Sequence, residues 1–163
     1  MNALVLTISD KGSRGERIDT AGPSVCKALA AAGYHVIDNI IIADDYNQIV
    51  TNLNQAVNNN INLIITAGGT GFSKRDITPE ATKAVIERET PGLNELMRLE
   101  SLKITNRAML SRATSGLKDN SLIVNLPGSE KAATENLSFI LPILEHGLQI
   151  LLGEDSNCGI PLK

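Results

Sequence analysis

The stretch between residues 62 and 81 reads NLIITAGGTGFSKRDITPEA, and it constrains the fold more than any other part of the sequence. Asn62 to Thr66 is an almost entirely apolar run rich in branched residues, which is typical of a strand buried on both faces of a parallel sheet. The run ends abruptly at Gly68 to Gly71, which we call the glycine loop. Glycines let the backbone pass close to a ligand and direct several N–H groups toward an anion. The stretch therefore predicts a buried strand followed by a candidate anion-binding loop.

A charged cluster and a helix start follow the glycine loop. Lys74, Arg75 and Asp76 bring two cations and a carboxylate just beyond it. Thr78 and Pro79 then indicate the start of a helix, with a hydroxyl cap and a proline at the first helical position. This order of strand, glycine loop and helix start favours a phosphate site at the carboxyl end of a sheet strand. The alternative is a tight turn whose glycines only satisfy the backbone geometry.

Strand-like and helical patterns alternate along the rest of the chain. Strands are expected at 3–8, 34–42 and 121–126, and helices at 20–32, after Asp44–Asp45, from Thr78 to about Arg88, at 93–102 and after Ser129. The segment from Arg112 to Val124 predicts a β-hairpin. Pro142 is expected to kink or split the last helix, and residues 153–163 to form an irregular tail. The alternation predicts one three-layer α/β domain over residues 1–163, a mostly parallel sheet flanked by helices with a small β-hairpin.

Composition and charge exclude several classes of partner. The chain carries a net charge of −3 and has two Phe, two Tyr and no Trp, so neither a broad nucleic-acid surface nor a base-stacking platform is expected. The amino terminus lacks the features of a signal peptide, and no apolar run is long enough to cross a bilayer. Cys26 and Cys158 have no metal-ligand spacing and are expected to be free thiols. We therefore expect a cytoplasmic protein without membrane or nucleic-acid partners.

Four polar loops are expected to follow strands of the sheet: Ser9–Arg17, Asp44–Asp45, Gly68–Asp76 and Pro127–Ser129. Because parallel strands end at the same edge of a sheet, these loops could form one site. Their glycines, hydroxyls, cations and isolated carboxylates suit a phosphate-bearing ligand with Mg²⁺, which takes one or two protein carboxylates and keeps most of its waters. Asp44 and Asp76 are the candidate metal ligands. One acid of the Asp44–Asp45 pair is expected to cap the next helix, which leaves the other for the ligand.

Other catalytic chemistries find little support in the sequence. His35 lies in the middle of an expected strand and His146 in the last helix, so we interpret both as structural. The chain contains no GxxxxGK[ST] loop, and GGTG is not the GxGxxG fingerprint of dinucleotide-binding proteins. Phosphoryl and nucleotidyl transfer depend mainly on positioning and charge neutralisation, and they need no activated nucleophile from the protein.

Several long motifs resemble those of the molybdenum-cofactor biosynthesis domain family. They cover most of the chain and read TISDKGSRGERIDTAGP, LIITAGGTGFSKRD, RDITPEA, PGLNELMR, AMLSRATSG and LIVNLPGSEKA. The pattern is most similar to the MogA-type molybdopterin adenylyltransferases. MoaB-type relatives share the fold and the GGTG loop, but some of them depart from the RDxTPEA stretch that is intact here.

The resemblance implies that Mg-ATP adenylylates the terminal phosphate of molybdopterin and that pyrophosphate is released. It implies that Asp76 is an essential acid of the metal–nucleotide site and Asp44 the second acid, although the choice between Asp44 and Asp45 stays open. The nucleotide phosphates would contact Gly68, Gly69, Thr70 and Gly71. The pterin or its phosphate would contact Ser9, Asp10, Lys11, Arg14, Pro127, Gly128 and Ser129. A homotrimer and a separate molybdenum-insertion protein are the implied partners.

Two other functions remain open at this point. A binding module would hold molybdopterin without efficient adenylylation, whereas a nucleotide-binding protein of another pathway would use the same generic loop chemistry. The intact RDITPEA stretch favours the enzyme over the module. The sequence leaves open whether molybdenum or tungsten is the metal inserted downstream.

Overall fold

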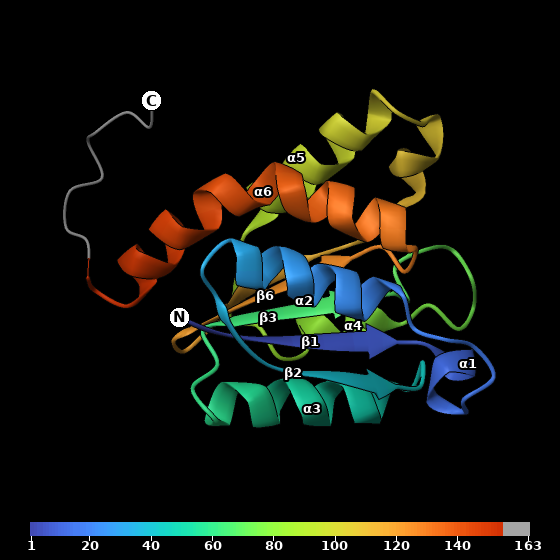
Figure 1. The fold of residues 1–163 in the computed structure, drawn as a ribbon, viewed down its shortest axis with the longest axis horizontal. Helices are drawn as coiled ribbons and strands as arrows, with labels where there is room; N and C mark the ends of the chain where they lie inside the picture. The colour runs from blue at the N-terminus through green and yellow to red at the C-terminus, as the bar shows by residue number, and fades with distance from the viewer. Residues whose placement is uncertain (155–163) are drawn as a thin grey trace.

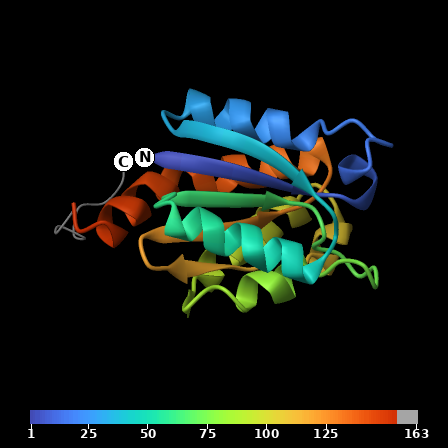
Figure 2. The same ribbon diagram turned by 90° about the horizontal axis from the view of Figure 1, so that it is seen from below.

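The computed structural model describes residues 1–154, which form one mixed sheet between two layers of helices (Figures 1 and 2). The strands are β1 (Asn2–Ile8), β2 (His35–Ile42), β3 (Leu63–Ala67), β4 (Arg88–Glu89), β5 (Ser115–Lys118) and β6 (Ser121–Leu126). They lie in the order β2–β1–β3–β6–β5–β4. β2, β1, β3 and β6 are parallel, whereas β5 is antiparallel to both of its neighbours. The predicted fold class, with its mostly parallel sheet and its hairpin, is confirmed.

Helices cover both faces of the sheet, and each face has its own apolar cluster. α2 (Ala21–Ala31), α5 (Pro91–Leu102) and α6 (Glu130–Leu151) pack on one face, and α3 (Tyr46–Asn58) and α4 (Thr78–Lys83) on the other. Two short elements, α1 (Asp10–Ser13) and the 3-10 helix η1 (Asn106–Leu110), follow β1 and α5. Ile64 enters one cluster and Ile65 the other, which explains the continuous apolar run of β3. Within residues 1–154, no helix has the length and apolar character needed to cross a membrane.

Several local expectations differ from the structure. α4 ends at Lys83 rather than near Arg88, because the chain turns back and pairs Arg88 and Glu89 with β5. The Thr78 side chain does not cap α4; its hydroxyl is buried and finds no hydrogen-bond partner among the described residues. Pro142 lies inside α6 without splitting it. Most of the expected tail, including Cys158, lies outside the described residues.

A buried amide ties the hairpin to the parallel part of the sheet. Asn125 of β6 is fully buried, and its Nδ2 donates to the hydroxyls of Thr66 and Thr82, each at 2.9 Å. Its Oδ1 accepts a hydrogen bond from the N–H of Thr114 at 3.2 Å. Because an unsatisfied buried polar group costs roughly 1–3 kcal/mol, this network fixes how β3, β6 and α4 meet.

Asp19 fixes the start of α2 against the first two strands. Its Oδ2 accepts hydrogen bonds from Thr7 Oγ1 at 2.7 Å and Asn39 Nδ2 at 3.0 Å, and its Oδ1 accepts one from the N–H of Gly22 at 2.9 Å. Burial disfavours ionisation of this carboxyl, but the hydrogen bonds outweigh burial and hold the pKa of Asp19 below its ordinary value. The ionised carboxylate is therefore the form that stabilises this junction.

We predict that Asp19→Asn lowers the free energy of unfolding at neutral pH by about 1–3 kcal/mol, because an amide NH₂ would face hydrogen-bond donors. The lowered pKa means that the carboxylate contributes stability above the ordinary value of 3.8, and that this contribution is lost as the pH falls through the lower folded-state pKa. The difference in the free energy of unfolding between wild type and variant should therefore be largest at neutral pH and should decrease below about pH 4. Urea unfolding over a pH series measures both effects.

Asp119→Asn is the matched control for this measurement. Asp119 is exposed in the hairpin turn, and asparagine also tolerates its left-handed backbone, with φ of 49°. The free energy of unfolding of the Asp119→Asn variant should equal that of the wild type at every pH. Equal stability of Asp19→Asn and wild type at neutral pH would contradict the anchoring role of Asp19.

Candidate functional site

The loops that follow β1, β2, β3 and β6 meet at one edge of the sheet, beside α1 (Figure 1). Two of them touch through their backbones, since a Cβ atom at Gly68 would lie only 2.2 Å from the carbonyl oxygen of Ile8. On the side of β6, a Cβ atom at Gly128 would lie 3.1 Å from the Cα atom of Gly68. Gly68 and Gly69 also have φ values of 118° and 63°, which favour glycine. These glycines therefore satisfy a backbone constraint, and the same close packing brings three loops together.

A cavity of about 290 Å³ opens between these loops, and we call it the first cavity. The site residues predicted from the sequence that line it are Ser9, Asp44, Gly68, Gly69, Asp76, Gly128 and Ser129. Other lining residues come from the ends of β1 and β3, from Gly12 of α1 and from the segment 17–21 that leads into α2. Predicted residues from four separate loops thus share one cavity.

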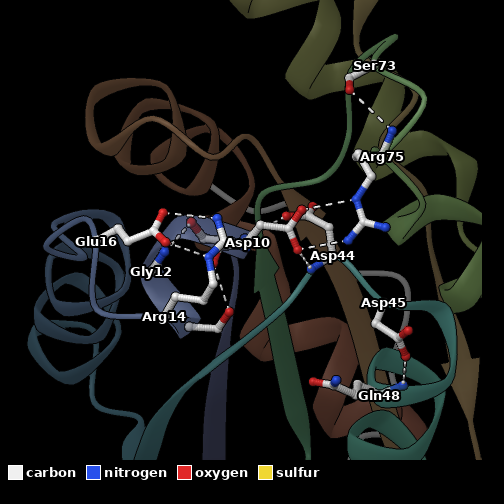
Figure 3. Close-up of polar contacts among 11 residues, drawn as sticks. Asp10, Gly12, Arg14, Glu16, Asp44, Asp45, Gln48, Ser73 and Arg75 are labelled. Atoms are coloured by element: carbon white, nitrogen blue, oxygen red, sulfur yellow. Dashed lines mark hydrogen bonds and ion pairs between the residues drawn. The ribbon is translucent and has the colours of Figure 1, made fainter.

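The two acids that follow β2 have different partners. Asp45 caps α3, because its side chain accepts a hydrogen bond from the N–H of Gln48 at 2.9 Å and points toward it (Figure 3). Asp44 instead faces Asp10: the N–H of Asp10 donates to Asp44 Oδ2 at 2.9 Å, and the N–H of Asp44 donates to Asp10 Oδ1 at 3.1 Å. Of this pair, Asp44 is the acid that lines the first cavity.

Asp76 reaches the same cavity from the segment that follows the glycine loop. Its Oδ2 accepts a hydrogen bond from the N–H of Ser73 at 2.9 Å, and its carbonyl oxygen accepts one from Arg112 Nη2 at 2.7 Å. A Cβ atom at Gly71 would lie 2.9 Å from Asp76 Oδ2, so the absence of a side chain at Gly71 leaves room for this carboxylate. Asp76 is therefore held by the loop that precedes it.

Asp44 and Asp76 together fit a magnesium ion. Their Oδ2 atoms are engaged as described, and no residue in the range 1–154 donates a hydrogen bond to either Oδ1. Burial raises the pKa of Asp44, and the nearby carboxylates of Asp10 and Asp76 also raise it, so a bound cation would stabilise the ionised pair. The described residues contain no group of three or more His, Cys, Asp or Glu that could hold a metal. Mg²⁺ suits such a site, because it completes its shell with water and phosphate oxygens.

Two helix amino termini offset the acidic lining of the first cavity. Its described lining includes the carboxylates of Asp19, Asp44 and Asp76, with Arg17 as the cation. α2 begins at the cavity wall, and Ser129 caps α6 there by accepting a hydrogen bond from the N–H of Ala132 at 3.3 Å. Helix amino termini carry partial positive charge and offer N–H groups to phosphates. A metal-bound phosphate fits this mixture better than a bare anion does.

A second cavity, of about 270 Å³, borders the other half of the glycine loop. The predicted residues that line it are Thr70, Gly71 and Pro127. The rest of its largely apolar wall comes from α5, η1 and the first turns of α6, with Arg98, Arg107 and Glu135 as its charged residues. The glycine loop and the turn Pro127–Ser129 thus separate the two cavities and contribute to both.

Some predicted residues lie outside both cavities. They follow Ser9, which itself lines the first cavity and caps α1 through a hydrogen bond from the N–H of Gly12 at 3.0 Å, so the expected open loop begins with a short helix. Lys11 lies in α1 and Arg14 directly follows it, and neither lines either cavity; Arg14 forms an exposed ion pair with Glu16 at 2.7 Å. Asp10 pairs with Arg75 at 2.9 Å, which lowers the pKa of Asp10. The contribution of these residues to a ligand site stays a prediction.

Two side chains that organise the site, Arg112 and Asp19, were not among the residues predicted from the sequence. Arg112 binds the glycine loop through two groups. Its side-chain Nε donates to the carbonyl oxygen of Gly71 at 2.7 Å, and its backbone N–H donates to the carbonyl oxygen of Thr70 at 2.9 Å. It also pairs with Glu80 of α4. Both residues lie inside the quoted motifs, AMLSRATSG and TISDKGSRGERIDTAGP, and membership of those motifs was the one signal that could have identified them.

Known proteins are similar to this chain in sequence and in fold. The chain is 38% identical over 152 residues to the molybdopterin adenylyltransferase of Helicobacter pylori strain J99, with 91% of this chain and 86% of the relative covered. It is 39% identical over 157 residues to gephyrin of Dictyostelium discoideum, where the match covers 90% of this chain but spans only 22% of the relative's length.

The solved structures include the molybdopterin biosynthesis enzyme MoaB from Thermus thermophilus, with a TM-score of 0.88 and 44% identity over 93% of this chain and 96% of that chain. Relatives named as adenylyltransferases and relatives named MoaB both match, so the comparisons do not decide between these subtypes. Residues 4–146 match the family described as "Probable molybdopterin binding domain". The family match over most of the chain, together with the shared fold, shows that this chain belongs to the molybdopterin-binding domain family of molybdenum cofactor biosynthesis.

Proposed function

We propose that this protein is a molybdopterin adenylyltransferase, which transfers the adenylyl group of Mg-ATP to the terminal phosphate of molybdopterin and releases pyrophosphate. One observation carries the proposal: Asp44 and Asp76, from loops distant in sequence, line one cavity with half of the glycine loop and the amino termini of α2 and α6. The similarity to a named adenylyltransferase over most of both chains supports it. The intact RDITPEA stretch also supports it.

In this proposal the first cavity receives the phosphates of ATP. Oδ1 of Asp44 and of Asp76 would hold Mg²⁺, which when bound neutralises part of the phosphate charge. The N–H group of Gly69 and the amino terminus of α6 would face phosphate oxygens, whereas the N–H of Gly68 donates to the carbonyl oxygen of Leu126 at 3.1 Å. Thr70 and Gly71 would extend this contact at the border of the second cavity.

The second cavity would receive the pterin ring, because its wall is largely apolar and its charged residues can meet polar ring edges. The turn Pro127–Ser129 connects the two cavities, with Pro127 at the second and Gly128 and Ser129 at the first. A pterin bound in this way would extend its terminal phosphate along the turn toward the nucleotide. Ser9, Lys11 and Arg14 would act at the phosphate end of this path, whereas the carboxylate of Asp10 is already bound by Arg75 and by the N–H of Asp44.

The reaction needs alignment more than it needs a protein nucleophile. An oxygen of the pterin phosphate would form a bond to the α-phosphorus of ATP, while the bond from that phosphorus to the bridging α–β oxygen breaks and pyrophosphate leaves. Such transfers depend on holding both reactants in line and on neutralising charge. His35 and His146 lie outside the lining of both cavities, in keeping with a reaction that does not use them as bases.

A molybdopterin-binding module without efficient catalysis is the second candidate. The 44% identity to a MoaB structure favours it, because the pterin site would be shared by both subtypes. Turnover is the property that separates the two candidates. The homotrimer and the downstream molybdenum-insertion protein stay predictions from the resemblance, and the cytoplasmic location stays a prediction from the sequence.

We predict that the purified protein releases pyrophosphate from Mg-ATP only when molybdopterin is present. A coupled pyrophosphate assay, with and without pterin and with EDTA in place of Mg²⁺, measures this dependence. Release without pterin would instead indicate another nucleotide acceptor. Pterin binding without release would assign the protein to the binding-module class.

We predict that Asp44→Asn and Asp76→Asn each reduce turnover by roughly 100-fold or more, because each removes charge at the point where phosphates react. Both variants keep an oxygen that can accept the backbone hydrogen bond, so their melting temperatures should stay close to that of the wild type. Steady-state pyrophosphate release and thermal unfolding on the same samples measure the two properties.

Asp45→Asn is the matched control for these variants. It removes the same charge one residue away, and asparagine caps helices as well as aspartate does. Because Asp45 serves α3 rather than the cavity, turnover should equal that of the wild type. Loss of activity in Asp45→Asn, with activity retained in Asp44→Asn, would reverse our assignment of the second acid.

A further inference from the structure

The carboxylate of Asp10 is engaged entirely by the protein itself (Figure 3). Arg75 Nε donates to Asp10 Oδ2 at 3.0 Å, and Arg75 Nη2 donates to Asp10 Oδ1 at 2.9 Å. The N–H of Asp44 also donates to Oδ1, at 3.1 Å. Asp10 does not line either cavity. These bonds therefore connect loops of the protein, and they leave no oxygen of Asp10 without a donor.

Asp10 in turn fixes the orientation of Asp44. The N–H of Asp10 donates to Asp44 Oδ2 at 2.9 Å, so the two residues exchange hydrogen bonds between backbone and carboxylate. With Oδ2 held in this way, Asp44 Oδ1 lies 3.1 Å from the position that a Cβ atom of Gly69 would take. The oxygen available for a ligand is thereby directed toward the glycine loop.

Arg75 belongs to the same short turn as Asp76. The N–H of Ser73 donates to Asp76 Oδ2 at 2.9 Å, and the N–H of Arg75 donates to Ser73 Oγ at 3.2 Å. The segment Ser73–Asp76 thus presents Asp76 to the first cavity while Arg75 extends to Asp10, the first residue of α1. A displacement of this segment would move Asp76 and weaken the support of Asp44 at the same time.

We propose that Arg75 is a positioning residue that acts through Asp10 to hold the carboxylates of Asp44 and Asp76 at the spacing required by a metal-bound nucleotide. The inference rests on the proposed function of these two acids. Arg75 does not line either cavity, and its Nε and Nη2 atoms already bind Asp10, so it acts on the acids and not on a phosphate. A planar guanidinium is needed, because a lysine ammonium does not reproduce its rigid two-pronged geometry.

Equilibrium binding of Mg-ATP, measured by calorimetry without pterin, tests the proposal independently of turnover. Arg75→Ala should weaken this binding by roughly 10- to 100-fold, the usual effect of removing a residue that orients a metal ligand. Arg75→Lys should recover only part of the loss. Because the ion pair is exposed and exposed pairs contribute little to folding, the melting temperature should change little.

A double-mutant comparison separates positioning from direct phosphate binding. Asp10→Asn removes the partner of Arg75, so the double variant Arg75→Ala/Asp10→Asn should bind Mg-ATP no more weakly than the weaker single variant. If Arg75 bound a phosphate directly, the two losses would add. Lys83→Ala is the control, because it breaks an exposed ion pair with Glu89, at 3.4 Å, away from both cavities, and should bind as the wild type does.

The possible results are distinct. Weaker Mg-ATP binding by the single variants, with losses that do not add in the double variant, would support the positioning role if Lys83→Ala binds normally. Wild-type binding by Arg75→Ala, or additive losses in the double variant, would overturn it and leave the proposed function intact. Absence of Mg-ATP binding by the wild-type protein would overturn the proposed function and this inference with it.

Discussion

The site depends on a contact between backbones at Gly68. The carbonyl oxygen of Ile8 would lie 2.2 Å from a Cβ atom at this position, and Gly128 approaches the Cα atom of Gly68 from the side of β6. Without side chains at this point, the ends of β1, β3 and β6 lie directly against one another. A methyl group at Gly68 would collide with backbone rather than with a side chain that can move, and the parallel pairing of these strands leaves little freedom to separate them.

The same packing brings several carboxylates close together, and the protein offsets their mutual repulsion. Asp10, Asp44 and Asp76 come from three loops, and the neighbouring carboxylates together with burial raise the pKa of Asp44. The N–H of Asp10 donates to Asp44, and the N–H of Asp44 and the Arg75 guanidinium donate to Asp10. The helix amino termini at the cavity wall add partial positive charge. The carboxylate oxygens that remain available suit a divalent cation. This balance of charge makes an acidic cavity compatible with the metal-bound phosphate of the proposed function.

Individual residues show how much of the site could be predicted from the sequence. The Asp44–Asp45 pair predicted one helix cap and one acid for a ligand, but only the path of the backbone after β2 assigned Asp45 to the cap. The sequence places Arg75 just after the glycine loop, but it does not predict its partner, because Asp10 lies 65 residues earlier in the chain. Arg112 contacts Gly71 from 41 positions away. Thr78, expected to cap α4 with its hydroxyl, instead buries that hydroxyl next to Gly69, because close packing at this edge of the sheet decided its environment.

The sequence by itself determined the class of fold, the order of the longer strands and helices along the chain, the family and the loops that line the candidate site, but not the short elements α1 and β4. These properties depend on local patterns of apolar, glycine and capping residues, whose effect extends over a few positions. The tertiary structure alone decided that the glycine loop divides two cavities, that Asp44 and Asp76 share the first, and that Arg75 and Arg112 hold the loops that shape them. Such contacts join residues distant in sequence, and their geometry follows from how parallel strands end at one edge of the sheet.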